Sequence, residues 1–139
     1  MKTKIKSEKE MLKLGAGFLK TLIPGDVVLL QGDLGSGKSV FARGFLNAAG
    51  IAVVPSPTFT IVNKYDTNIG TVFHMDAYRI DDIEEARAAG LDEIIDDKSA
   101  IKFIEWPQKI TEILPKKHTL INITKMGDDT RELTVEVKQ

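Results

Sequence analysis

The 139-residue chain contains no cysteine, and only 6% of its residues are aromatic. The missing cysteines exclude a disulfide framework, thiolate metal sites and a cysteine nucleophile. No apolar run is long enough to span a membrane, and none follows the basic residues at the start of the chain. We therefore expect a cytoplasmic protein that folds without cross-links and has no membrane partner.

An excess of charge of one sign is also missing, because 19 lysines and arginines stand against 20 aspartates and glutamates. A net charge of −1 gives no broad attraction to a polyanion. We therefore expect no DNA partner, and we expect that a partner protein holds any RNA on which this chain acts. The length suits one domain, which we place over residues 1–139.

Eight consecutive residues carry the most informative pattern in the chain. The segment Gly32–Ser39 reads G-D-L-G-S-G-K-S and fits the phosphate-binding loop (P-loop) pattern G-x-x-x-x-G-K-[ST] at every fixed position. The apolar run Val27–Leu30 precedes it as a buried strand would, and Val40–Ala49 follows with apolar residues at helical spacing. Strand, loop and helix come in the required order, so the sequence predicts a nucleoside triphosphate site.

The chemistry of such a loop gives its residues distinct roles. Backbone N–H groups of the loop and of the following helix N-terminus surround the phosphates. The ammonium group of Lys38 is expected to follow the β- and γ-phosphates, and the Ser39 hydroxyl is expected to be a ligand of Mg²⁺. The residues predicted to contact the nucleotide here are Asp33, Leu34, Gly35, Ser36, Gly37, Lys38, Ser39 and Val40.

Two acidic residues close predicted strands and complete the expected site. Asp76 follows Val72–Met75, and Glu105 follows Ile101–Ile104. A triphosphatase needs an acidic group near Mg²⁺ and a group that places the attacking water, and strand ends beside the loop usually supply them. We predict that Asp76 and Glu105 are catalytic with Lys38 and also bind the metal. Which of the two acids contacts Mg²⁺ directly stays open.

For three further residues, a purely structural role must be weighed against a role in the site. Thr58, on a proline-flanked segment, suits a switch position that offers an oxygen to Mg²⁺ or the γ-phosphate, but it also suits a plain strand. Trp106, directly after Glu105, is either a core residue or a neighbour of the nucleotide. His74 is expected to be a packed or hydrogen-bonded histidine.

The remaining patterns predict the α/β class, as a single P-loop NTPase domain with a central mixed sheet flanked by helices. Turn residues between the predicted strands of 58–76 and of 119–137 indicate two antiparallel hairpins within an otherwise parallel sheet. Predicted helices cover 7–22, 40–49, 81–89, 91–95 and a short stretch ending at 114, and predicted strands cover 2–6, 27–30, 58–65, 71–76, 100–106, 119–123 and 132–137.

Taken together, these segments resemble the bacterial TsaE (YjeE) family over nearly the whole chain. The matching residues, in order, are Gly32–Ser39 with Arg43-Gly44, Ser56–Thr60 with Tyr65, His74–Arg79, Ile104–Pro107 and Leu114-Pro115. The family more often has threonine at the position of Ser39 and a second hydroxyl residue at the position of Val40. Neither difference removes a group that the predicted chemistry requires.

The resemblance implies a small, Mg²⁺-dependent ATPase that acts with TsaB and TsaD. Together they make the threonylcarbamoyladenosine beside the anticodon of tRNA, which this chain would reach through its partners. The resemblance also implies ATP binding by Gly32–Ser39, metal or catalytic roles for Asp76 and Glu105, a switch-like role for Thr58 and a functional role for Trp106.

Two other functions compete with a partner-coupled ATPase. A small-molecule kinase uses the same loop, but such kinases usually close an arginine-rich lid over the phosphoryl group. The arginines available for one are Arg43, Arg79, Arg87 and Arg131, which disfavours a kinase. A binding module that responds to a nucleotide without hydrolysing it is compatible with every pattern in the sequence.

Overall fold

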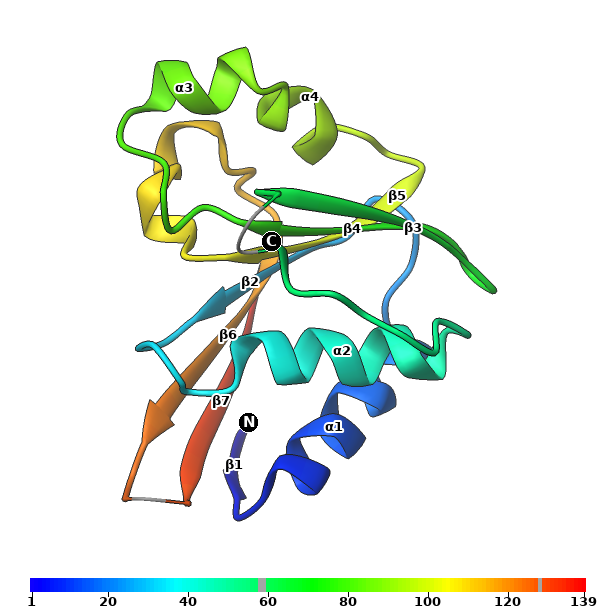
Figure 1. The fold of residues 1–139 in the computed structure, drawn as a ribbon, viewed down its shortest axis with the longest axis vertical. Coiled ribbons are helices and arrows are strands. Elements are labelled where there is room, and N and C mark those ends of the chain that lie inside the picture. Colours follow the sequence, from blue (N-terminus) through cyan, green and yellow to red (C-terminus); the bar gives the residue numbers. More distant parts are fainter. Residues whose placement is uncertain (58–59, 128) are drawn as a thin grey trace.

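The computed structural model describes residues 1–57, 60–127 and 129–139, and within them the chain forms a seven-stranded mixed sheet between two groups of helices (Figure 1). The strand order across the sheet is β1-β7-β6-β2-β5-β4-β3. The strands are β1 (Lys2–Ile5), β2 (Val27–Gln31), β3 (Val62–Thr67), β4 (Gly70–Asp76), β5 (Ala100–Glu105), β6 (His118–Lys125) and β7 (Arg131–Lys138).

The centre of the sheet is parallel and its edges are antiparallel. Strand β2 pairs in parallel with both β5 and β6, and β5 pairs in parallel with β4. The hairpins β3–β4 and β6–β7 are antiparallel, as is the pair β1–β7. This arrangement confirms the predicted mixed sheet with two hairpins, and it brings the carboxyl ends of β2, β4 and β5 to one edge.

Helices cover both faces of the sheet (Figure 1). On one face lie α1 (Glu8–Gly17), continued by the 3-10 turn η1 (Phe18–Lys20), and α2 (Lys38–Ala48). On the other lie α3 (Ile83–Ala88), α4 (Leu91–Ile95) and the 3-10 turns η3 (Pro107–Lys109) and η4 (Thr111–Ile113). Among the described residues, no helix combines the length and the apolar character needed to cross a bilayer.

The start of α1 follows from its sequence. The Ser7 hydroxyl accepts the Glu10 backbone N–H at 3.1 Å and so caps the helix, and the Glu10 carboxylate accepts the N–H of Lys6, the residue before the cap, at 3.3 Å. Helices α1 and α2 then cross at close range. A Cβ atom at Gly44 would lie 2.2 Å from the Leu12 carbonyl oxygen, so only glycine permits this approach.

Alternating side chains of the central strands pack into two hydrophobic cores, one on each face of the sheet. Val28 and Leu30 point toward α1 and α2, whereas Val27 and Leu29 point toward α3 and α4. In the first core the ring centroids of Phe45, on α2, and Phe103, on β5, lie 4.9 Å apart. Burial of each such ring contributes roughly 1.5–3 kcal/mol, so this contact fixes α2 against the parallel strands.

Two predicted elements differ from the structure. The strand predicted from 58 begins only at Val62, because Ile61 takes a left-handed backbone conformation (φ 68°) and its N–H donates to the Pro57 carbonyl at 2.8 Å. The predicted site residue Thr58 lies outside the described residues. The short helix predicted to end at 114 is instead the pair of 3-10 turns, which Ile110 separates with a non-helical backbone (φ −134°, ψ 36°).

Candidate functional site

The glycine-rich loop, residues 32–39, joins the carboxyl end of β2 to the first turn of α2. Gly35 (φ 76°) and Gly37 (φ 110°) take left-handed conformations that a side chain would strain. Helix α2 begins at Lys38, directly after Gly37. The free N–H groups of its first turn carry partial positive charge at the end of the loop. The predicted nucleotide-contacting residues 33–40 are therefore gathered around one helix N-terminus.

Lys38 is buried although its ammonium group carries a charge. Only 5% of Lys38 is exposed, and its Nζ donates to the carbonyl oxygens of Gly32 at 2.6 Å and Asp33 at 3.0 Å. Burial lowers the pKa of Lys38 from its usual value, and the nearby carboxylates of Glu105 and Asp76 partly oppose that shift. A buried ammonium group held mainly by neutral partners is suited to receive an anion.

The two predicted acids lie side by side, because Asp76 on β4 is the register partner of Glu105 on β5. Both are buried, and the Ser39 hydroxyl donates to Glu105 Oε2 at 2.7 Å. Asp76 Oδ1 accepts the backbone N–H of Tyr78 at 2.9 Å. Like charges on neighbouring strands repel each other, so this pair favours a cation at the strand ends.

The donor atoms here fit Mg²⁺ better than a transition metal. They are the hydroxyl oxygen of Ser39 and the carboxylate oxygens of Glu105 and Asp76. Mg²⁺ prefers oxygen ligands and is usually held by one or two carboxylates, with phosphate and water completing its shell. Among the described residues, no group of three or more histidine, cysteine, aspartate or glutamate side chains could hold a metal ion. Ser39, Glu105 and Asp76 could hold Mg²⁺ together with phosphate and water oxygens.

His74 also reaches this cluster. Its Nε2 lies 2.6 Å from Glu105 Oε2, and the side chain is 1% exposed. Its other ring nitrogen, Nδ1, is buried and has no hydrogen-bond partner among the described residues. The prediction of a packed or hydrogen-bonded histidine is confirmed.

Two basic residues of the β6–β7 hairpin reach the loop from far along the chain, and the sequence did not indicate them. Arg131 donates through Nε to the Ser36 carbonyl and through Nη2 to the Gly35 carbonyl, both at 3.1 Å. Lys125 Nζ lies 3.1 Å from where a Cβ atom of Gly35 would stand. The hairpin is predictable, but its place beside the loop depends on β6 pairing with β2.

Trp106 lies beside the loop lysine. Its ring centroid is 4.4 Å from Lys38 Nζ and 4.8 Å from the ring of Tyr78. Its backbone is left-handed (φ 58°), which is uncommon for a bulky residue and turns the chain sharply after β5. Trp106 and Tyr78 border a cleft of about 350 Å³, which is also lined by residues 34–39 of the loop, by both acids and by Arg79.

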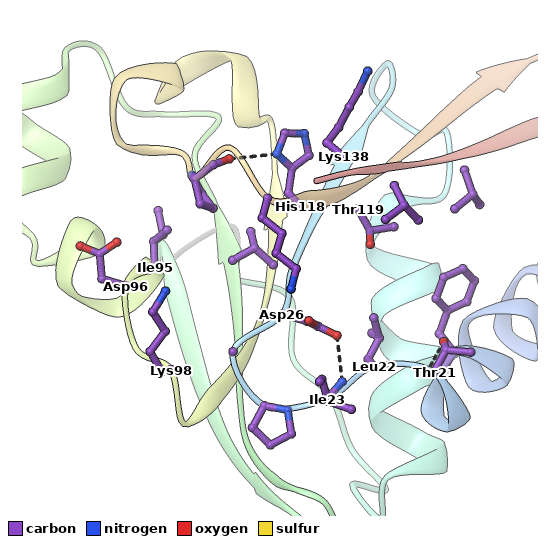
Figure 2. A pocket seen from close by; sticks show the side chains of 18 residues that line it. Thr21, Leu22, Ile23, Asp26, Ile95, Asp96, Lys98, His118, Thr119 and Lys138 are labelled. Atoms are coloured by element: carbon purple, nitrogen blue, oxygen red, sulfur yellow. Dashed lines mark hydrogen bonds between the residues drawn. The ribbon is translucent and has the colours of Figure 1, made fainter.

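Two other hollows lie near the surface of the sheet. One, of about 420 Å³, adjoins the loop from the side of α1 and is lined in part by Ile5, Ser7, Met11 and Arg131. The other, of about 570 Å³, lies at the amino ends of β2 and β6, and Figure 2 shows Asp26 and His118 lining it. Ligands of parallel sheets bind at carboxyl strand ends, so this larger hollow is not the expected site.

The fold and the site define a class: an α/β protein whose glycine-rich loop places a buried lysine beside two paired acidic strand ends. The model of the family described as "Threonylcarbamoyl adenosine biosynthesis protein TsaE" matches residues 5–133. The chain belongs to the TsaE family.

Individual relatives agree with that membership. The tRNA threonylcarbamoyladenosine biosynthesis protein TsaE of Bacillus subtilis (strain 168) is 43% identical over 127 residues, which cover 91% of this chain and 77% of that protein. The protein of the same name from Haemophilus influenzae is 36% identical, covering 93% of this chain and 84% of its own length. A crystal structure of Bacillus subtilis YdiB is similar with a TM-score of 0.82 and 33% identity, and covers 100% of this chain and 86% of that one.

Proposed function

We propose that this chain is a Mg²⁺-dependent ATPase that takes part in the threonylcarbamoyladenosine modification of tRNA. The observation that carries the proposal is the hydrogen bond from Ser39, the last residue of the loop, to Glu105, whose register partner is Asp76. This hydrogen bond connects the phosphate-binding loop to the pair of acidic side chains. The tRNA modification in the proposal comes from the names of the relatives.

The two hollows that share the loop divide the nucleotide between them. The cleft with Asp76, Glu105 and Lys38 has the charges for the terminal phosphates and their metal. The hollow on the α1 side shares 35–37 of the loop, and its apolar lining is Ile5, Met11 and Val40. Charged side chains, Glu8 and Asp129 among them, also line it. An aromatic base is better buried against apolar side chains than among carboxylates. We therefore assign the adenosine part to the α1 side.

Hydrolysis at this site needs few groups. The oxygen of a water molecule attacks the γ-phosphorus while the bond to the β,γ-bridging oxygen breaks, leaving ADP and inorganic phosphate, and the proton passes to phosphate or solvent. Lys38 would offset charge on the phosphates, and the acid that does not bind the metal directly, Asp76 or Glu105, would accept a hydrogen bond from the water. Ser39 with Glu105 or Asp76 would hold Mg²⁺, which when bound neutralises phosphate charge.

A net charge of −1 gives this chain no broad attraction to tRNA. We propose TsaB and TsaD, the proteins that the family resemblance implies, as its partners in the cytoplasm. In this proposal ATP hydrolysis resets their assembly between rounds of modification, and the tRNA is held by those partners.

Two measurements test the proposal. Phosphate release from ATP with Mg²⁺ should be slow for the chain alone, faster with TsaB and TsaD, and at background for Lys38→Ala. Phosphoryl transfer to a small molecule would identify a kinase, and binding without release would identify a binding module. Multiple-turnover tRNA modification should need the parent chain. Equal turnover without it, or full stimulation by Lys38→Ala, would rule out an ATP-driven role.

A further inference from the structure

We propose that His74 is a positioning residue that holds Glu105 in the orientation needed to share the metal site with Ser39. This inference rests on the proposed function, because it concerns the same Mg²⁺-nucleotide site. The strand register explains how the histidine arrives there. His74 pairs with Phe103, and Asp76 pairs with Glu105, so all four side chains project to the α2 face of the sheet.

One carboxylate oxygen receives both neighbours. Glu105 Oε2 lies 2.6 Å from His74 Nε2 and 2.7 Å from Ser39 Oγ. An ionised carboxylate only accepts hydrogen bonds, so beside ionised Glu105 the hydrogen lies on His74 Nε2 and the imidazole is the donor. Two short bonds from different elements to the same oxygen fix the rotation of a side chain that otherwise has several rotamers.

Packing alone does not account for a histidine at this position. The ring is 1% exposed, and its Nδ1 is buried without a hydrogen-bond partner among the described residues. Buried polar atoms are nearly always paired, and leaving one unpaired is unfavourable. An apolar side chain of similar size would fill the same space without that penalty. The bond from Nε2 to Glu105 is the feature that only the histidine supplies.

The consequence is specific to the metal. Without the Nε2 donor, Glu105 can rotate away from Ser39, and the oxygen ligands of the metal lose their mutual placement. The Lys38 ammonium group is held by the Gly32 and Asp33 carbonyls and not through Glu105, so it should still bind phosphate. Partners that orient metal ligands typically change metal affinity by about 10- to 100-fold. We expect His74 to affect the metal-dependent part of nucleotide binding.

A pair of amide variants tests this inference. His74→Gln carries an amide that reaches about as far as Nε2, whereas the amide of His74→Asn reaches only about as far as Nδ1. Met75→Ala is the matched control, because Met75 is a fully buried neighbour on the same strand that faces the opposite core. For each protein, calorimetry gives the ADP affinity with EDTA and with Mg²⁺, and Mn²⁺ binding to the ADP complex is followed by electron paramagnetic resonance.

We expect His74→Asn to lose about tenfold or more in Mn²⁺ affinity and in the Mg²⁺ enhancement of ADP binding, with EDTA values within about twofold of the parent. His74→Gln should recover most of the loss, and Met75→Ala should lower the melting temperature only. Parental metal affinity in His74→Asn, or an equal loss in Met75→Ala, would overturn the positioning role alone. A parent that binds ADP without any Mg²⁺ enhancement would overturn the proposed function as well.

Discussion

The ammonium group of Lys38 stacks on Trp106, with Nζ 4.4 Å from the ring centroid. Its hydrogen bonds go to the carbonyl oxygens of Gly32 and Asp33, within its own loop. These partners are neutral, whereas a nucleotide would offer anionic oxygens, which bind an ammonium group more strongly. Phosphate binding should therefore draw the Lys38 ammonium group away from its carbonyl partners. This movement would change its contact with the Trp106 ring.

Trp106 fluorescence should change when ATP and Mg²⁺ are added. Trp106 is the single tryptophan of the chain, so the signal has one source. Its indole borders the cleft that holds Lys38, and altered contact with a charged group changes its emission. The measurement is a fluorescence titration, with Trp106→Phe as the blank. A flat titration, with binding established by calorimetry, would make Trp106 a core residue only.

Alkaline pH should act on stability and on ATP affinity with opposite signs. Burial lowers the pKa of Lys38, so between that pKa and the ordinary lysine value the unfolded chain binds more protons than the folded one. The free energy of unfolding therefore rises with pH across this window. Phosphate prefers the charged lysine, so ATP affinity falls across the same window. Denaturant titrations and calorimetry at several pH values measure the two trends.

Lys102 provides the control for this pH dependence. Its pKa is also lowered by burial, and its Nζ donates to the carbonyl of Asp97 at 2.5 Å, toward the start of β5 and away from the loop. Lys102→Met should remove part of the rise in stability and leave the fall in ATP affinity unchanged. Lys38→Met should remove part of the rise and abolish the pH dependence of affinity. If ATP affinity still falls with rising pH in Lys38→Met, a group other than Lys38 causes that fall.

Ser39→Ala should reduce the Mg²⁺ enhancement of nucleotide binding by about tenfold, while binding in EDTA changes little. The hydroxyl is the oxygen that joins the loop to Glu105, and alanine removes only this oxygen. Ser39→Thr keeps the hydroxyl and should retain the enhancement. Calorimetric titrations with and without Mg²⁺ measure both variants. The same metal dependence in Ser39→Ala as in the parent would show that the hydroxyl is not a ligand.

Removing the charge of either acid should lower turnover more than ATP affinity. Glu105→Gln and Asp76→Asn keep the shape of each side chain but lose the anion, and groups that act on metal and water affect the transition state most. We expect a loss of about 100-fold or more in phosphate release, with ATP affinity within about tenfold. Steady-state rates of phosphate release and binding constants for ATP measure the two effects in each variant. A variant that hydrolyses ATP at the parental rate would exclude its residue.

The sequence predicts the loop and both acids because each depends on local pattern alone. Strand ends can be located from apolar runs, so Asp76 and Glu105 are identifiable without knowing which strands are neighbours. Their direct pairing is not identifiable, because apolar runs do not fix the register between β4 and β5. The place of Glu105 beside the loop depends in turn on β5 pairing with β2, which has two strands between it and β5 in the chain. The same limit applies to His74, whose bond to Glu105 depends on the β4–β5 register. Sequence order does not fix strand order.

Arg131 is the clearest case of this limit. It lies at the start of β7, yet its guanidinium group donates to the carbonyls of Gly35 and Ser36. Within a peptide unit the C=O and the N–H point in opposite directions. When Arg131 holds a carbonyl on one side of the loop, the N–H of the same peptide unit therefore points to the other side. By fixing two successive carbonyls, Arg131 favours the loop conformation in which its N–H groups can face a phosphate. The hairpin therefore supports the loop from outside the sequence motif.

Arg131→Ala should weaken ATP binding by about tenfold, because the loop loses donors to two carbonyls and must be ordered by the nucleotide instead. Arg131→Lys should recover only part of this affinity, since an ammonium group lacks the planar fork that spans both oxygens. Arg87→Ala is the matched control, because Arg87 is an exposed arginine on α3 paired with Glu84. Calorimetry gives the affinities, and thermal unfolding checks that each variant is folded. Full affinity in Arg131→Ala, or equal losses in Arg131→Ala and Arg87→Ala, would show that the guanidinium does not order the loop.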